Sequence, residues 1–127
     1  MDTDIYKNMV LVNMTDLETE FINQSKNYYQ VSTDLANAIR QYESARELLR
    51  NKKALLALSL KANAATKMTV SDIENSVDSD PEIYDLVQQT VELEYNKNLI
   101  AGVLRSLDNK REMLKSLAWA QPKSDSF

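Results

Sequence analysis

One seven-residue pattern runs through residues 79–119, which read SDPEIYDLVQQTVELEYNKNLIAGVLRSLDNKREMLKSLAW. The stretch opens with a strong helix-start signal, because Asp80 is a favoured N-cap and Pro81 suits the first helical position, where its missing N–H is not needed. Seam positions then recur in steps of three and four, which is typical of a helix packed along one face. We therefore expect a long helix over residues 81–119. Its seam positions are Ile83, Leu86, Thr90, Leu93, Lys97, Ile100, Leu104, Leu107, Arg111, Leu114 and Ala118.

A second seven-residue repeat precedes this stretch and predicts another long helix, over residues 15–62. Thr15 and Glu18 match the S/T-x-x-E capping box that opens helices. The repeat itself is Phe21, Tyr28, Leu35, Tyr42, Leu49 and Leu56. The positions four residues after these are less apolar, namely Ser25, Ser32, Ile39, Arg46, Lys53 and Leu60. The seam is therefore imperfect, and two alternatives stay open: a kink near residues 31–34, or a wider packed face that includes Val31, Ala38, Ala45, Leu48 and Leu55.

These two helices predict an all-α fold, a long antiparallel helical hairpin with a short helical connector. Residues 1–14 would form an N-terminal arm, residues 63–80 the connector and residues 120–127 a disordered tail. Ile73 and Val77 suit one short helical turn within the connector. Because a two-helix hairpin buries only one face of each helix, we expect hairpins to pack into a homo-oligomeric bundle or ring. The residues expected in core or oligomer packing are Leu35, Leu49, Leu56, Leu86, Leu93, Ile100, Leu104, Leu107, Leu114 and Trp119.

The composition excludes several kinds of functional site. The chain has no His and no Cys, which removes His general bases, thiol nucleophiles and Cys/His zinc sites. Its single glycine excludes Gly-rich phosphate loops, and its acidic residues lack the spacing of a calcium-binding EF-hand. We therefore expect no enzymatic activity, no cofactor and no metal site. The start of the chain does not read as a signal peptide, and no apolar run approaches about 18 residues, so we expect a cytoplasmic protein.

Charge is sorted along the chain. Residues 35–69 carry seven Lys or Arg and two acidic residues, whereas residues 70–96 carry eight acidic residues and no basic one. A basic segment offers a surface to a polyanion or an acidic partner, and an acidic segment offers one to a basic neighbour. In a hairpin the two segments lie near the same end, so we expect them to neutralise each other in part.

The candidate nucleic-acid-binding residues are Arg46, Arg50, Lys52, Lys53 and Lys61. Arg46, Arg50 and Lys53 follow one another in steps of four and three, so they share a helix face. Such a row can track a phosphate backbone and releases counterions when it binds. The alternative is an ordinary solvated face, whose cations pair with Glu43 and Glu47 or with the acidic segment.

Aromatic side chains are candidate stacking platforms for nucleic-acid bases. Phe21, Tyr28 and Tyr42 fall on the helix seam, so we expect them to pack in the core. Tyr29 lies off that seam and is expected to be exposed. Trp119 stands at the end of the second helix, where it would anchor a subunit contact or cap the hairpin.

The chain resembles the UvsY-type recombination mediators of phages. Residues 52–60, KKALLALSL, are similar to that family's basic-then-leucine segment, which carries DNA contacts. Residues 72–83 resemble its acidic connector before the last helix, and Arg111, Lys115 and Trp119 resemble its basic, aromatic-containing end. Lys52 and Lys53 are the positions that match best. The family tends to place further basic and aromatic residues after the leucines, whereas here Lys61 is followed by Ala-Asn-Ala-Ala.

The resemblance implies a homo-oligomer that binds single-stranded DNA and helps to load a phage recombinase while a single-strand-binding protein is displaced. A phage-encoded protein of this kind would act in the host cell cytoplasm. The alternative is a non-enzymatic helical module that binds or inhibits another protein and does not bind nucleic acid. A salt-dependent affinity for single-stranded DNA distinguishes the two hypotheses.

Overall fold

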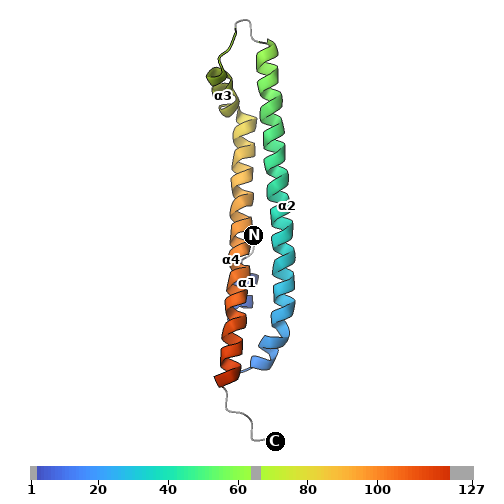
Figure 1. Cartoon of the computed structure of the whole chain (residues 1–127), viewed down its shortest axis with the longest axis vertical. Helices are drawn as coiled ribbons and strands as arrows, with labels where there is room; N and C mark the ends of the chain where they lie inside the picture. Colours follow the sequence, from blue (N-terminus) through green and yellow to red (C-terminus); the bar gives the residue numbers. More distant parts are fainter. Residues whose placement is uncertain (1–2, 64–66, 121–127) are drawn as a thin grey trace, which may run out of the picture. The chain divides into compact units, whose positions relative to one another are not determined.

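The computed structural model describes residues 3–63 and 67–120, and within these ranges the regular structure is entirely α-helical (Figure 1). The predicted all-α class is therefore confirmed. The four helices are α1 (Asp4–Val10), α2 (Leu17–Asn63), α3 (Val70–Asp78) and α4 (Pro81–Ala120). The predicted tail lies outside the described residues, except that Ala120 is the last residue of α4.

The chain divides into two compact units. The terminal unit comprises Met1–Ala36 and Asn98–Phe127, and the central unit comprises Asn37–Lys97. Both long helices contribute to both units, since α2 and α4 each span a unit boundary. Within each unit the segments of α2 and α4 pack antiparallel, as the two heptad patterns predicted (Figure 1).

Local side-chain caps explain where three of the helices begin. The carboxylate Oδ1 of Asp80 accepts hydrogen bonds from the backbone N–H groups of Glu82, at 2.9 Å, and Ile83, at 3.3 Å. The Thr69 hydroxyl oxygen likewise accepts from the Asp72 N–H at 3.1 Å and opens α3. Each contact satisfies a donor that has no partner within its helix. The start signals read from the sequence at residues 80–83 are thus found in the structure.

The cap of α2 differs from the predicted one. Thr15 bonds to the side chain of Asn13, and its hydroxyl does not cap the helix. Asp16 takes that role instead, because its Oδ1 accepts from the Thr19 N–H at 3.1 Å while its Oδ2 accepts from the Thr19 hydroxyl at 2.7 Å. These bonds to the ionised form lower the pKa of the Asp16 carboxyl. The expected Thr15–Glu18 capping box is therefore replaced by an Asp16–Thr19 pair one residue later.

The core of the central unit forms where α3 packs on the long helices. Ile73 and Val77 of α3 and Ile83 of α4 are buried together. The short helical turn expected at residues 73–77 is therefore part of this core. The partly buried side chains packed against these three are Leu49, Leu56, Ala57, Leu60, Met68 and Val87.

The core of the terminal unit centres on Val31, Leu107 and Leu114, which are fully buried. Helix α1 belongs to this unit and arises in the segment expected to be an arm. Its Tyr6 hydroxyl donates a 2.7 Å hydrogen bond to Oδ2 of Asp34 on α2. Burial and this carboxylate raise the pKa of Tyr6 to about 12, because both disfavour the phenolate.

A buried polar cluster also lies in the terminal unit. The Lys110 ammonium is 2.7 Å from the Glu20 carboxylate and donates a 2.7 Å hydrogen bond to the backbone oxygen of Met9. The Gln24 amide nitrogen donates to the backbone oxygen of Leu107 at 2.8 Å. Lys110 thus links α4 to α2 and to the end of α1.

The buried face of α2 differs from the expected one, in which the second packed position lay four residues after each repeat residue. The second buried position lies three residues after the repeat, at Val31 and Ala38, and not four residues after it. Ile39, one of the predicted second positions, is 41% exposed. At Val31 and Ala38 the +3 position holds an apolar side chain, whereas burying a polar side chain such as Ser32 at a +4 position would be costly. The wider-face alternative therefore accounts for part of the packing.

The residues expected in core or oligomer packing differ in burial. Ile100, Leu107 and Leu114 are buried. Trp119 is 85% exposed and does not pack in the core of this chain. The remaining members are partly buried, namely Leu35, Leu49, Leu56, Leu86, Leu93 and Leu104.

Candidate nucleic-acid interface

All five basic residues predicted from the sequence lie on the part of α2 that belongs to the central unit. Arg46, Arg50, Lys53 and Lys61 lie along one side of α2, which continues without interruption from Leu17 to Asn63, and Lys52 is turned about 100° from Lys53. Lys61 stands near its C-terminal end, is exposed, and makes no ion pair with any residue that the structure describes. The members of this row, called the α2 basic row below, are Arg46, Arg50, Lys52, Lys53 and Lys61.

The two arginines of the row pair with glutamates one turn earlier on the same helix. Arg46 Nη1 lies 3.4 Å from Oε1 of Glu43, and Arg50 Nη1 lies 3.0 Å from Oε2 of Glu47. These are the partners expected in the solvated-face alternative. Helical pairs at this spacing are worth only about 0.2–0.5 kcal/mol each.

The two lysines pair with acidic residues that the chain brings back from the following segment. Lys52 Nζ is 3.4 Å from Oε1 of Glu82 at the start of α4, and Lys53 Nζ is 3.7 Å from Oδ1 of Asp78 at the end of α3. The expectation that the acidic segment lies beside the basic one is thereby confirmed at two specific contacts. Both contacts form within the central unit.

Solvent exposure makes all four pairs weak. The eight side chains involved are 41–68% exposed. Exposed ion pairs contribute about 0–1 kcal/mol and are screened by salt, since water solvates the separated charges almost as well. The carboxylates therefore hold the cations in place without sequestering them, and a phosphate can compete for each one.

Tyr42, a seam residue of α2, contacts one arginine of the row and a lysine of α4 through its ring. The Tyr42 ring has Lys97 Nζ 4.3 Å and Arg46 Cζ 5.4 Å from its centroid, distances at which a cation is attracted to the ring face. Its hydroxyl donates a 2.8 Å hydrogen bond to Glu94 Oε2, which raises the pKa of Tyr42. The contribution of Lys97 was not predicted from the sequence, although a charged residue at a seam position was a signal.

Five of the eight basic residues of the central unit belong to the α2 basic row. The central unit as a whole contains eight Lys or Arg residues and ten Asp or Glu residues. A polyanion would therefore meet favourable charge along α2 and unfavourable charge near α3 and the start of α4. This asymmetry would limit the contact of a polyanion to one side of α2.

Two other kinds of site are not found among the described residues. No group of three or more Asp, Glu, His or Cys side chains in residues 3–63 and 67–120 is arranged to hold a metal ion. None of the helices described combines the length and the apolar character needed to cross a membrane.

No protein-family model, curated protein or solved structure matches this chain.

Proposed function

We propose that this chain is a non-enzymatic, oligomeric protein that binds single-stranded DNA and helps to load a phage recombinase. The observation that carries the proposal is the α2 basic row, whose cations are exposed and held only by weak, solvated ion pairs. Each cation that exchanges its carboxylate for a phosphate releases a counterion from the DNA. Binding is then driven mainly by charge and is insensitive to base sequence.

The proposed mechanism is multivalent. One helix with a handful of paired cations binds weakly, but copies of the row in an oligomer raise the effective concentration of each further contact. A strand held across several copies would be displaced from a single-strand-binding protein and presented to the recombinase. The resemblance to UvsY-type mediators supports this order of events.

Removing the two lysines of the row should weaken DNA binding and its salt dependence. We expect Lys52→Ala/Lys53→Ala to lower the slope of log affinity against log salt by about 0.7 for each phosphate of the single strand that the variant no longer neutralises. Fluorescence anisotropy of a labelled oligothymidylate, titrated at several salt concentrations, measures both quantities.

Lys7→Ala/Arg105→Ala is the matched control, because it also removes two exposed basic residues, which lie outside the row in the terminal unit. It should leave the affinity and the salt slope nearly unchanged. Absence of binding by the wild-type protein at low salt would refute the proposed function, as would binding that Lys52→Ala/Lys53→Ala leaves intact.

A specific surface feature supports self-association, and with it the alternative of a protein-binding module. Leu48, Leu55 and Leu58 on α2 are 46%, 64% and 64% exposed. Spacings of seven and three residues place them along one side of the helix. This leucine stripe is suited to contact a second copy of the hairpin, since burying it would remove apolar area from water.

Substituting charged residues into the leucine stripe should therefore reduce self-association. We expect the wild-type protein to have a native mass by light scattering that is a multiple of the 14.5 kDa chain mass, and Leu48→Glu/Leu55→Glu to shift it toward the monomer. Val91→Glu, at an apolar position of α4 that is 58% exposed and does not belong to the stripe, is the control and should keep the oligomer. A wild-type monomer at all concentrations would contradict self-association.

A further inference from the structure

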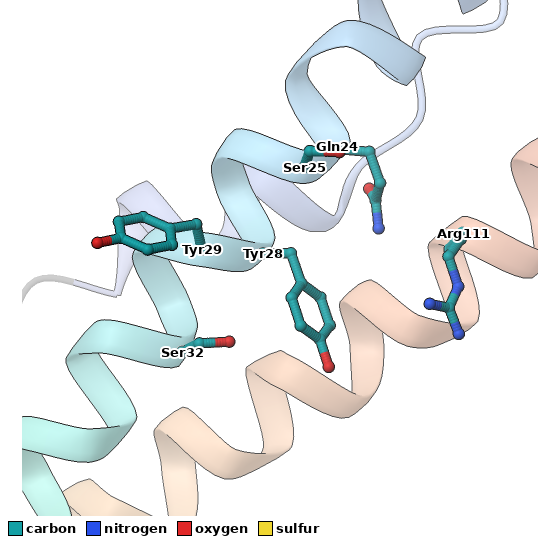
Figure 2. A pocket seen from close by; sticks show the side chains of 6 residues that line it. All are labelled: Gln24, Ser25, Tyr28, Tyr29, Ser32 and Arg111. Carbon is teal, nitrogen blue, oxygen red and sulfur yellow. The ribbon is translucent and has the colours of Figure 1, made fainter.

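An open groove of about 420 Å³ lies in the terminal unit, apart from the α2 basic row. Figure 2 shows that five of its side chains come from one stretch of α2 and that the sixth, Arg111, faces them from α4. The residues that line it are Gln24, Ser25, Tyr28, Tyr29, Ser32 and Arg111. Aromatic rings, a cation and hydroxyl groups are thus gathered around one hollow.

Two tyrosine rings bound this groove. Tyr28 is half-buried and points toward α4, whereas Tyr29 points away from α4 and is 75% exposed (Figure 2). Consecutive residues on a helix diverge by about 100°, so the two rings offer separate faces. An exposed tyrosine beside a groove is a surface on which a planar base can stack without sequence preference.

Arg111 supplies the charge. Its guanidinium is exposed and makes only long contacts, with Nη2 3.8 Å from Asp108 and Nε 3.7 Å from Glu112. A guanidinium presents several N–H donors in one plane and binds phosphate oxygens in pairs. The loose carboxylate contacts leave those donors available to an anion that enters the groove.

Gln24 adds an unused acceptor in the groove wall. It is buried, and its Nε2 donates to the Leu107 carbonyl, which fixes the orientation of the amide. The opposite atom, Oε1, is buried and accepts no hydrogen bond from any residue that the structure describes. A buried acceptor without a partner is uncommon, because desolvating it is costly.

We propose that this groove is a base-stacking subsite for single-stranded nucleic acid, in which a base stacks on Tyr29 and another phosphate of the same strand binds Arg111. The inference rests on the proposed function and adds to it a second contact surface, which senses the base and not only the backbone. Single strands suit the groove because their bases are unstacked and accessible, whereas duplex bases are covered.

The test compares an oligothymidylate with an abasic oligonucleotide of equal length, which keeps the phosphates and lacks the bases. Tyr29→Leu should weaken binding of the oligothymidylate by about fivefold or more and leave binding of the abasic strand unchanged. Arg111→Gln should weaken binding of both strands. Tyr95→Leu, which changes an exposed tyrosine of the central unit, is the matched control and should weaken neither.

The outcomes separate the two proposals. Equal effects of Tyr29→Leu on both strands, or no effect on either, would overturn the groove while Lys52→Ala/Lys53→Ala still tests the basic row. Failure of the wild-type protein to bind either strand would overturn both proposals. Thymidine 5′-monophosphate bound as tightly as the oligonucleotide would identify a free-nucleotide site and overturn the strand-binding subsite. Circular dichroism of each variant confirms that helicity is retained.

Discussion

Replacing Leu107 by alanine is expected to lower the free energy of unfolding by about 2–5 kcal/mol. Leu107 is fully buried, as are two other residues of the terminal unit, Val31 and Leu114. The substitution removes the transfer energy of the side chain and leaves a cavity that the surrounding helices fill only in part. The total free energy of unfolding of a small domain is about 5–15 kcal/mol, so this one change would leave the fold marginally stable.

Urea denaturation followed by circular dichroism measures this effect. Leu11→Ala is the matched control, because Leu11 is a leucine of the same unit that is 57% exposed. Its substitution should change stability by less than about 0.5 kcal/mol. Equal losses of stability for the two variants would contradict the packing of the terminal core around Leu107.

Breaking the buried Lys110–Glu20 pair should have an effect of similar size. The two side chains are 3% and 15% exposed, and 2.7 Å separates ammonium from carboxylate. Lys110→Ala leaves the Glu20 carboxylate without its cation in a site that water hardly reaches. The expected loss of stability is about 3–5 kcal/mol, because an uncompensated buried charge costs more than the pair itself contributes.

Two further variants distinguish the loss of the buried pair from the loss of a lysine charge elsewhere on α4. Glu20→Gln/Lys110→Met removes both charges together and should recover most of that stability. Lys115→Ala removes an equivalent lysine of α4 whose Glu112 partner lies 3.5 Å away in an exposed pair, and it should cost at most about 1 kcal/mol. A destabilisation by Lys110→Ala no larger than that by Lys115→Ala would refute the buried pair.

The sequence predicts the long helices because their signals are local. Asp80 and Pro81 mark the start of α4, and the repeat through Ile100, Leu107 and Leu114 marks its buried face. Each signal depends on residues within a few turns of one another. The same is true of α3, whose short turn at Ile73 and Val77 was expected.

The contacts that the sequence does not reveal join residues far apart in the chain. Lys110 and Glu20 form a buried pair across two helices, but each alone reads as an ordinary surface charge. Helix α1 is too short for a periodic pattern, and it is held by the Tyr6 bond to Asp34 and by the Met9 carbonyl. These contacts become visible only once the helices are packed together.

The residues of the candidate site could be predicted from the sequence, whereas their ion pairing could be predicted only in part. Charge sorting identified the α2 basic row and its acidic neighbour. Pairing of Lys52 with Glu82 and of Lys53 with Asp78 depends on how α3 folds against α2. The groove at Tyr29 and Arg111 joins two helices, so no single stretch of sequence indicates it.

The most direct measurement of the central claim removes the carboxylates that pair with Lys52 and Lys53. In the anisotropy titration at low salt, Asp78→Asn/Glu82→Gln should tighten binding of single-stranded DNA by about twofold to tenfold, since each exposed pair is worth at most about 1 kcal/mol. Asp72→Asn/Glu74→Gln removes the same charge from α3 without freeing either lysine and should give a smaller gain. Adding Lys52→Ala/Lys53→Ala should abolish the difference between these two variants. Equal affinities for the two carboxylate variants, or no gain from either, would contradict binding of DNA by the α2 basic row.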